Sequence, residues 1–353
     1  MTKLVPVFDG HNDLVLKLAE AGADRDKLWL EGKGAWHLDL PRMLKGGFAG
    51  GLFAIFLPSP HTDGPDDHPM SAPTYDLPLP APLPLKEAQA MAVDLLGQLL
   101  WMERVAGGRF RWCRSAGEIR KAMAEGVVAG VMHFEGAEAI GPNLDALHVF
   151  HAMGLRSVGP VWSRPTIFGH GVPFRYPGTP DTGPGLTPLG KDLVRECNKL
   201  RVMIDLSHLN EAGFFDVAKL SDAPLVATHS NAHAMTTSTR NLTDDQLRAI
   251  AESGGIAGLN LGACFLRPDG RENTDMTLEP VKQHIGHMLK VAGEDCVGIG
   301  SDYDGCPTPN PIGGAEGLPV LIEAMREMGL GEALIAKIAH GNWLRVLERT
   351  WGA

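Results

Sequence analysis

The chain has 353 residues, a formal net charge of −10 and 44% hydrophobic residues. This apolar fraction is too high for a disordered chain, and a net negative charge without a basic block argues against nucleic acid as the main partner. The length allows one large α/β domain or two ordinary ones. Because no composition break marks a linker, we expect a single domain over residues 1–353.

The start of the chain carries no apolar segment behind a basic one, and no stretch approaches the roughly 18 apolar residues of a membrane span. The cysteines are odd in number and include no C-x-x-C pair, which is typical of reduced thiols in a cytosolic enzyme. We therefore expect a cytoplasmic protein that makes no contact with a membrane. The cysteines are Cys113, Cys197, Cys264, Cys296 and Cys306.

Eight short apolar runs bounded by turn residues are the candidate strands. They are nearly continuous in Val, Ile, Leu, Ala and Gly, as is expected of strands covered on both faces. In chain order they are Val5–Asp9, Gly50–Leu57, Val127–Phe134, Arg156–Val161, Arg201–Leu206, Leu225–Thr228, Gly255–Asn260 and Cys296–Gly300.

Helical patterns separate these runs. Lys86–Val105 is long and amphipathic, and Ser115 with Glu118 three residues later predicts a capping box. Thr243 predicts the start of another helix, which Gly254 ends. Strand and helix alternating eight times predict a single (β/α)₈ TIM-type barrel, and no G-x-G-x-x-G follows the first strand to suggest a dinucleotide fold.

Two long Pro/Gly-rich loops, Pro58–Pro84 and Ser163–Pro188, follow the second and fourth candidate strands. Loops of this length in a compact domain are usually functional or disordered. In a barrel, loops that follow strands lie over the C-terminal face, where active sites form. We expect both loops to cover the site.

Polar residues follow the apolar runs at the strand ends, which converge at one mouth of a barrel. Their imidazoles and carboxylates suit a first-row metal, with zinc the best match. On an extended strand end, two residues at H-x-D spacing point the same way, so the first pair is a plausible chelate. The candidate ligands are His11, Asp13, Glu135, His208 and His229, followed by Asp302 after the last strand. His133 shares a face with Glu135, and its role stays open between ligand and structural histidine.

Five motifs in order carry a family resemblance. They are D-G-H-N-D near the start, E-G after the third strand, I-D-L-S-H, A-T-H-S with its histidine twenty-one residues later, and G-I-G-S-D-Y-D-G. Over Phe8 to about Leu347 the chain resembles the renal (membrane) dipeptidase family of binuclear zinc peptidases. That family belongs to the amidohydrolase superfamily of metal-dependent (β/α)₈ barrels.

The resemblance implies a complete ligand set for two Zn²⁺ ions. By this match His11 and Asp13 hold one ion, His208 and His229 hold the other, and Glu135 bridges both together with a shared hydroxide. Two cations on one water lower its pKa enough to supply hydroxide at neutral pH.

The resemblance also implies roles in the reaction. Asp302 would act as general acid and base, and Arg240, eleven residues after His229, would bind the terminal carboxylate of the substrate. Many family members carry a histidine near the substrate carbonyl after the fourth strand, whereas Trp162 occupies that place here. An indole N–H donates one hydrogen bond but carries no charge, so Arg164 or His170 are candidates to replace the missing group.

The resemblance therefore implies a zinc-dependent dipeptidase that cleaves free dipeptides and tolerates a D-residue at the C-terminal position. Its partners are expected to be dipeptides, and a homodimer stays open. Two alternatives remain. One is another amidohydrolase reaction on the same centre, such as hydrolysis of N-acyl amino acids, lactones or cyclic amides. The other is a non-catalytic metal-binding barrel.

Overall fold

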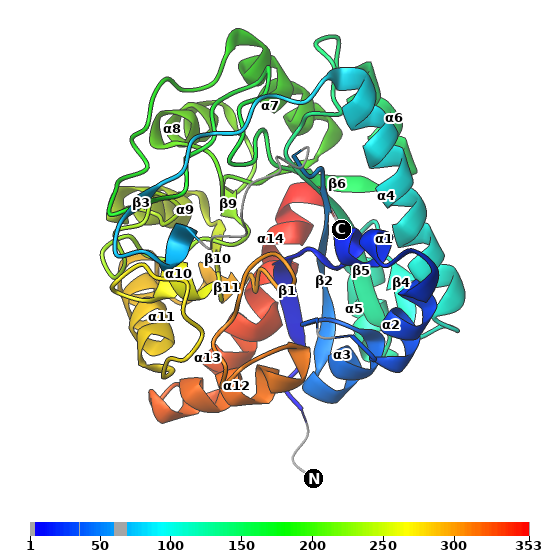
Figure 1. Cartoon of the computed structure of the whole chain (residues 1–353), viewed down its shortest axis with the longest axis vertical. Helices are drawn as coiled ribbons and strands as arrows, with labels where there is room; N and C mark the ends of the chain where they lie inside the picture. Colours follow the sequence, from blue (N-terminus) through cyan, green and yellow to red (C-terminus); the bar gives the residue numbers. More distant parts are fainter. Residues whose placement is uncertain (1–3, 35, 60–68, 353) are drawn as a thin grey trace.

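A parallel barrel forms the centre of the molecule (Figure 1). The computed structural model describes residues 4–34, 36–59 and 69–352. In this part of the chain, the strands of the wall run parallel in the order β8-β6-β5-β2-β1-β11-β10-β9. They are β1 (Val7–Asn12), β2 (Phe48–Phe56), β5 (Val128–Glu135), β6 (Leu155–Val158), β8 (Met203–Ile204), β9 (Val226–Ala227), β10 (Ile256–Leu259) and β11 (Val297–Ile299). The predicted fold class is confirmed.

The barrel closes between β8 and β9, where the strands are shorter than predicted. A single parallel bridge joins Asp205 to Val226. The carboxylate of Asp205 accepts backbone hydrogen bonds from Ser207 at 3.1 Å and from Thr228 at 2.8 Å. A side chain thus replaces part of the backbone ladder at this seam, so the regular strand pairing ends early.

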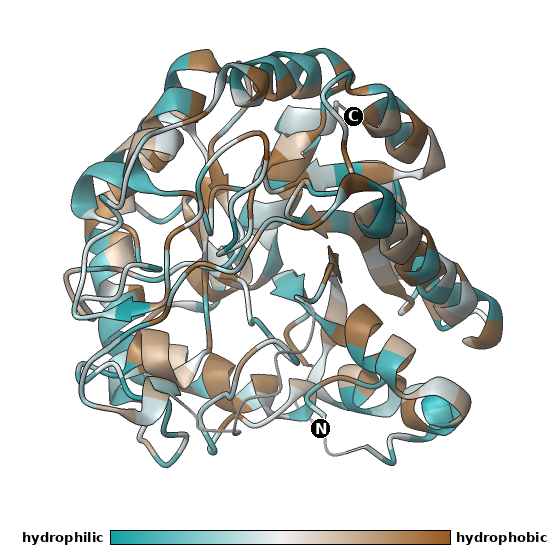
Figure 2. Ribbon diagram, turned by 45° about the horizontal axis from the view of Figure 1, so that its top comes forward, coloured by the Kyte–Doolittle hydropathy of each residue, from teal (hydrophilic) through white to brown (hydrophobic). Residues whose placement is uncertain are grey.

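Helices surround the strands, and Figure 2 shows hydrophobic residues along the strands while the outer helices mix hydrophobic and hydrophilic residues. None of the described helices is long and apolar enough to cross a membrane. The helices are α1 (Leu14–Glu20), α2 (Arg25–Glu31), α3 (Leu40–Gly46), α4 (Leu85–Val105), α5 (Ala116–Ala124), α6 (Asp145–Met153), α7 (Pro188–Leu200), α8 (Glu211–Leu220), α9 (Asp244–Ser253), α10 (Ala263–Leu266), α11 (Glu279–Ala292), α12 (Leu318–Glu327), α13 (Glu332–Ala336) and α14 (Asn342–Trp351).

The structure confirms the predicted starts of two helices but differs from the prediction in one hydrogen bond. Thr243 and Gln246 form the full capping box of α9, and Gly254 ends that helix with φ 67°. Ser115 caps α5 as predicted, since its hydroxyl accepts from the backbone N–H of Glu118. The carboxylate of Glu118, however, accepts from the backbone of Arg114 at 2.6 Å, one residue before the expected partner.

The two long loops are tied together, a pairing that the sequence did not predict. Residues 60–68 of the first loop lie outside the described residues. Its later part forms β3 (Tyr75–Asp76), which pairs with β7 (Arg175–Tyr176) of the second loop in an antiparallel ribbon. A further strand, β4 (Phe110–Trp112), pairs with the start of β5. None of these three segments stands out in the sequence as an apolar run bounded by turn residues, so they were not predicted as strands.

The base of the barrel is closed by α14, drawn in red in Figure 1. Trp343 on this helix is fully buried, and its indole N–H donates to the backbone carbonyl of Ile299 at 2.9 Å. A Cβ at Gly10 or at Gly298 would collide with its ring, so both strands need glycine there. The tryptophan fills the space that these glycines leave at the bottom of the barrel.

Replacing Trp343 with Ala should lower the free energy of unfolding by about 3–5 kcal/mol, because it opens a cavity that the barrel base cannot close. Trp351→Ala is the matched control, since Trp351 ends the same helix but is only partly buried. Denaturant unfolding of both variants checks the prediction. Equal losses at the two positions would contradict the role of Trp343 as the filler of the barrel base.

Candidate metal centre and substrate cavity

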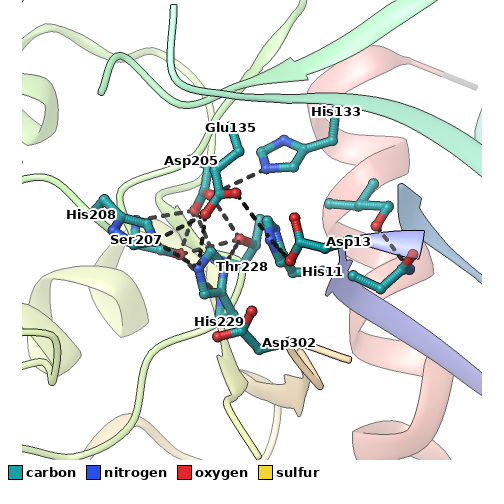
Figure 3. A network of polar contacts seen from close by, with 12 residues as sticks. His11, Asp13, His133, Glu135, Asp205, Ser207, His208, Thr228, His229 and Asp302 are labelled. Atoms are coloured by element: carbon teal, nitrogen blue, oxygen red, sulfur yellow. Dashed lines mark hydrogen bonds and ion pairs between the residues drawn. The ribbon is translucent and has the colours of Figure 1, made fainter. Parts of the chain in front are cut away.

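All six predicted centre residues come together at the C-terminal mouth of the barrel, and all are buried. His11 lies on β1 and Glu135 ends β5, while the others stand on the loops that directly follow strands. Figure 3 shows their side chains pointing toward one another from these different elements. Chain segments almost 300 residues apart therefore contribute to one site. The residues are His11, Asp13, Glu135, His208, His229 and Asp302.

Glu135 lies between two groups of ligands (Figure 3). Its Oε1 is 3.0 Å from Nε2 of His208 and 3.6 Å from Nε2 of His229. Its other oxygen, Oε2, is 3.6 Å from Nε2 of His11, which in turn is 3.5 Å from Oδ2 of Asp13. The two oxygens of one carboxylate thus face different imidazoles, and ligand atoms of His11, Glu135 and His229 all lie within 4.8 Å of one another.

The tautomer of His229 follows from its neighbours. Thr228 Oγ1 donates its one proton to Asp205 Oδ2 at 2.7 Å, so it accepts from Nδ1 of His229, also 2.7 Å away. Nε2 of His229 then carries a lone pair, 3.1 Å from Nε2 of His208. Both ring nitrogens of His11 lack a hydrogen-bond partner among the described residues. Buried imidazole nitrogens gathered in this way fit a metal ion, which binds the neutral ring.

Hydroxyl groups orient two of the candidate ligand histidines. Ser163 Oγ lies 2.9 Å from Nδ1 of His208, and Thr228 Oγ1 lies 2.7 Å from Nδ1 of His229. Hydrogen bonds to the outer ring nitrogen commonly fix the orientation of a metal-binding histidine and leave the inner nitrogen directed at the ion. The arrangement turns Nε2 of both rings toward Glu135.

Electrostatics distinguish the carboxylate from the imidazoles. Burial raises the pKa of Glu135 to about 7, although His11 acts in the opposite direction. Burial also lowers the pKa of His208 and of His229 well below the usual histidine value. Burial would lower the pKa of His11 as well, but Glu135 and Asp13 outweigh it and raise that pKa. A cation would stabilise this set, because it satisfies neutral imidazoles and a buried carboxylate at once.

His133 lies beside His11, in an edge-to-face contact with 5.2 Å between ring centroids. Its Nδ1 is 2.8 Å from Ser157 Oγ and its Nε2 is 3.5 Å from Asp205 Oδ2. Together with His11 and Asp205, it forms a further group of donor atoms within 4.8 Å of one another. His133 is not among the residues that line the substrate cavity described below.

Asp302 follows β11 in the left-handed region, with φ 58°. Burial raises the pKa of its carboxyl, while His11 lowers it and Asp13 raises it further. Donor atoms of these three residues lie within 4.8 Å of one another. The side chain amide of Asn260 donates to Oδ2 of Asp302 at 2.8 Å. Asp302 therefore has a fixed orientation beside the candidate metal ligands.

A cavity of about 260 Å³ opens directly over this centre. Aromatic rings form one of its walls in an unbroken series. Phe56 and Trp162 are 4.9 Å apart between ring centroids, Trp162 and Phe174 are 5.7 Å apart, and Phe174 and Phe265 are 6.2 Å apart. The full lining comprises Asp13, Leu16, Lys17, Phe56, Met70, Glu135, Trp162, Phe174, His208, Arg240, Phe265, Glu272, Asp302, Asp304, Gly305 and Cys306. An apolar wall facing a polar floor is typical of a small-molecule site.

The two residues considered as replacements for the family histidine do not line this cavity. Arg164 is fully buried, and Glu138 binds it at 2.8 Å through Nη2 and at 3.0 Å through Nε. Arg164 also donates to the carbonyl of Leu57, and its guanidinium lies 5.6 Å from the centroid of the Trp162 ring. His170 is also absent from the lining. Arg164 is therefore already paired within the fold and is not available to a substrate carbonyl, whereas a role of His170 stays a prediction.

Arg240 lines the cavity and is buried, so it is not the surface arginine that its loop position alone would suggest. Its Nη1 donates to the carbonyl of Ser207 and to Ser230 Oγ, and its Nη2 donates to the carbonyl of His229 at 3.2 Å. Its Nε has no hydrogen-bond partner among the described residues. Nε and Nη2 form the guanidinium edge that commonly pairs with a carboxylate through two hydrogen bonds.

Several residues of the site escaped the sequence analysis. Asn260 is the polar residue at the end of a predicted strand. The same rule that identified the candidate metal ligands could therefore have identified it. Phe174 stands in an irregular segment and Phe265 in the four-residue helix α10, and neither segment carries a periodic signal. Gly305 lies where any Cβ would meet both Asp13 Oδ2 and Asp302 Oδ1, a contact visible only in the folded chain.

Known proteins with similar sequences and structures place the site in a family. The family model of the membrane dipeptidases (peptidase family M19) matches residues 1–351. A metallopeptidase from Rhodobacter sphaeroides, crystallised with a phosphinate mimic of the dipeptide L-Ala-D-Ala, is 58% identical with a TM-score of 0.97 and covers 99% of this chain and 100% of its own. Dipeptidase AC, also a metallopeptidase of family M19, is 59% identical with the same TM-score and coverage.

A curated relative from Klebsiella pneumoniae, known as the uncharacterized protein in the pqqA 5′ region, is 46% identical over 263 residues, which are 73% of this chain and 97% of that protein. The family match spans nearly the whole chain and agrees with the resemblance seen in the sequence. It decides against a non-catalytic barrel. The chain belongs to the membrane dipeptidase family, peptidase family M19, and is a metallo-dipeptidase.

Proposed function

We propose that this dipeptidase uses two zinc ions and cleaves free dipeptides, including those with a D-residue at the C-terminal position. The observation that carries the proposal is the position of Glu135. Its Oε1 faces His208 and His229, while its Oε2 faces His11. A carboxylate shared in this way is suited to two cations, since it offsets the repulsion between them.

The donor set supports zinc at both positions. His11 and Asp13 with Glu135 would hold one ion, and His208 and His229 with Glu135 would hold the other. Imidazole nitrogen and carboxylate oxygen are donors that zinc accepts readily. When bound, the two ions would supply a hydroxide nucleophile at neutral pH and polarise the peptide carbonyl.

Asp302 is proposed to move the proton. Its carboxylate lines the cavity and lies beside Asp13 and His11. It would accept a proton when the nucleophile attacks and return it to the nitrogen of the leaving amine, which is the general acid–base role.

Arg240 and the aromatic wall are proposed to select the substrate. The Nε–Nη2 edge of Arg240 would bind the terminal carboxylate, and the apolar side chains of the dipeptide would lie against Trp162 and its neighbours. The cavity of about 260 Å³ is lined both by Arg240 and by candidate metal ligands, so it can hold both ends of a small substrate. The proposal for a D-residue is supported by the Rhodobacter sphaeroides relative, which was crystallised with a mimic of L-Ala-D-Ala.

A panel of L-Xaa-L-Xaa and L-Xaa-D-Xaa dipeptides, with the corresponding N-acetyl amino acids, tests the substrate class. Metal content measured on the same samples tests the cofactor. We expect turnover of dipeptides of both configurations by protein that holds close to two zinc ions per chain. Faster turnover of the N-acetyl amino acids, which lack a free ammonium group, would favour the alternative amidohydrolase reaction instead.

Replacing Glu135 with Ala should reduce the metal content and lower kcat/KM by several orders of magnitude, because both ions lose their shared ligand. Elemental analysis and dipeptide turnover measure the two effects. Glu138→Ala is the matched control, since Glu138 is a buried carboxylate three residues away that pairs with Arg164. It should lose stability but keep its metal. A full complement of metal in the Glu135 variant would refute the bridging role.

Replacing Asp302 with Asn keeps the size of the side chain and removes the base. The loss in kcat should be about 10²–10⁴-fold, the usual contribution of a general acid–base group. Metal content should stay close to that of the wild type, which separates proton transfer from metal binding. A variant that retained more than about a tenth of the wild-type kcat would show that Asp302 is not the proton carrier.

Replacing Arg240 with Ala should lower kcat/KM about tenfold to a few hundredfold, the range expected for a lost hydrogen bond to a charged group. The loss should be much smaller on the C-terminal amide of the same dipeptide, which has no negative charge. Lysine should restore activity only in part, since it cannot form the two-pronged contact. Equal losses on acid and amide, with a lowered Tm, would mean that Arg240 only supports the loop.

A further inference from the structure

Asn260 directly follows β10, a strand that supplies none of the proposed metal ligands. Its side chain is buried at the mouth of the barrel, beside the cavity floor. Four hydrogen bonds of its amide determine its orientation, one of them from the thiol of Cys306 to Oδ1 at 3.8 Å. Oδ1 accepts from the backbone N–H of Gly262 at 2.6 Å, while Nδ2 donates to Asp302 Oδ2 at 2.8 Å and to the carbonyl of His229 at 3.3 Å. A flipped amide would place its carbonyl oxygen against the Asp302 carboxylate, so the donor must face Asp302.

The backbone of Asn260 is held independently of its side chain. Its N–H donates to Oδ1 of Asn231 at 2.9 Å, and its carbonyl accepts from Nδ2 of Asn231 at the same distance. This pair of bonds joins the loop after β9 to the end of β10. Because Asn231 holds the backbone of Asn260, the side-chain amide is not needed to fix the backbone and can hold Asp302.

The two oxygens of Asp302 lie in different surroundings. Oδ2 is bound by Asn260, whereas a Cβ built on Gly305 would meet Oδ1 of Asp302 together with Oδ2 of Asp13. Oδ1 therefore lies on the side of the candidate metal ligand. The left-handed backbone at Asp302, with φ 58°, is a conformation that needs support from its neighbours.

We propose that Asn260 is a positioning residue for the reaction: its amide holds Oδ2 of Asp302 and leaves Oδ1 as the oxygen that exchanges the proton. A carboxylate oxygen that accepts a short N–H bond is a poor place for a proton, so the contact assigns separate tasks to the two oxygens. This inference rests on the proposed role of Asp302 as proton carrier.

The test is a double-mutant cycle on the zinc-loaded enzyme with a dipeptide substrate. Asn260→Ala should lower kcat about tenfold to a hundredfold, since it removes a hydrogen bond to a charged group, and should leave KM within about twofold. The same change made in the Asp302→Asn background should cost less than about twofold, because the group that Asn260 serves is already lost. Equal losses in the two backgrounds would overturn the inference.

Asn260→Asp separates hydrogen bonding from space filling. It keeps the shape but removes the N–H donor and places a second negative charge against Asp302, so its kcat should be no higher than that of Asn260→Ala. Recovery of wild-type kcat by this variant would refute the inference. Asn342→Ala is the matched control, because Asn342 is also buried and donates two hydrogen bonds, to the carbonyls of Glu294 and Val297 at the barrel base. It should lower Tm without changing kcat.

Failure of the inference differs from failure of the proposed function. If Asp302→Asn keeps its activity, Asp302 is not the proton carrier and the proposed mechanism falls together with the role of Asn260. If Asp302→Asn is inactive but Asn260→Ala retains wild-type kcat, only the role of Asn260 is refuted. The metal content of each variant, measured in parallel, should match that of the wild type, and its loss in Asn260→Ala would equally refute a role confined to Asp302.

Discussion

The carboxylate of Glu135, shared between His11 on one side and His208 and His229 on the other, is the contact on which the rest of the site depends. A buried carboxylate beside the neutral imidazoles of His208 and His229 is costly unless a cation joins it. A cation bound to this carboxylate needs further ligands, which must come from opposite sides of the barrel to one point. Only the convergence of strand ends at one mouth brings them there, so fold and centre are linked through this residue.

A layer of polar groups behind the ligands keeps that geometry in place. Asp205 accepts hydrogen bonds from the backbone and the hydroxyl of both Ser207 and Thr228, and Thr228 in turn determines the tautomer of His229. The same carboxylate joins the two strands at the seam of the barrel. Each member of such a network is satisfied by the next, which makes the arrangement specific as well as stable. The same polar network therefore closes the barrel and orients a candidate metal ligand.

The base of the barrel contributes mainly to stability, whereas the mouth carries the residues proposed for the chemistry. At the base, Trp343 and the residues around it are apolar and closely packed, with glycines on the strands to receive the ring. At the mouth, strain and buried charge gather, as in the left-handed backbone of Asp302 and the crowded carboxylates beside Gly305. The packing at the base offsets the free energy that strain and buried charge cost at the mouth. This pattern is expected where a rigid scaffold carries a reactive site.

Much of this protein was already determined by its sequence. Eight apolar runs predicted the barrel because a buried parallel strand must be apolar on both faces, and the polar residues that end those runs predicted the candidate metal ligands that meet at the mouth. The motifs from His11 to Asp302 also indicated the family. The sequence did not reveal the Asn260–Asp302 contact, the pairing of Arg164 with Glu138, the wall from Phe56 to Phe265, or the ribbon that ties the two loops. These features join segments far apart in the chain, and no periodicity reports which of them meet. Only the closed barrel decides that, because its curvature determines which loops share the mouth.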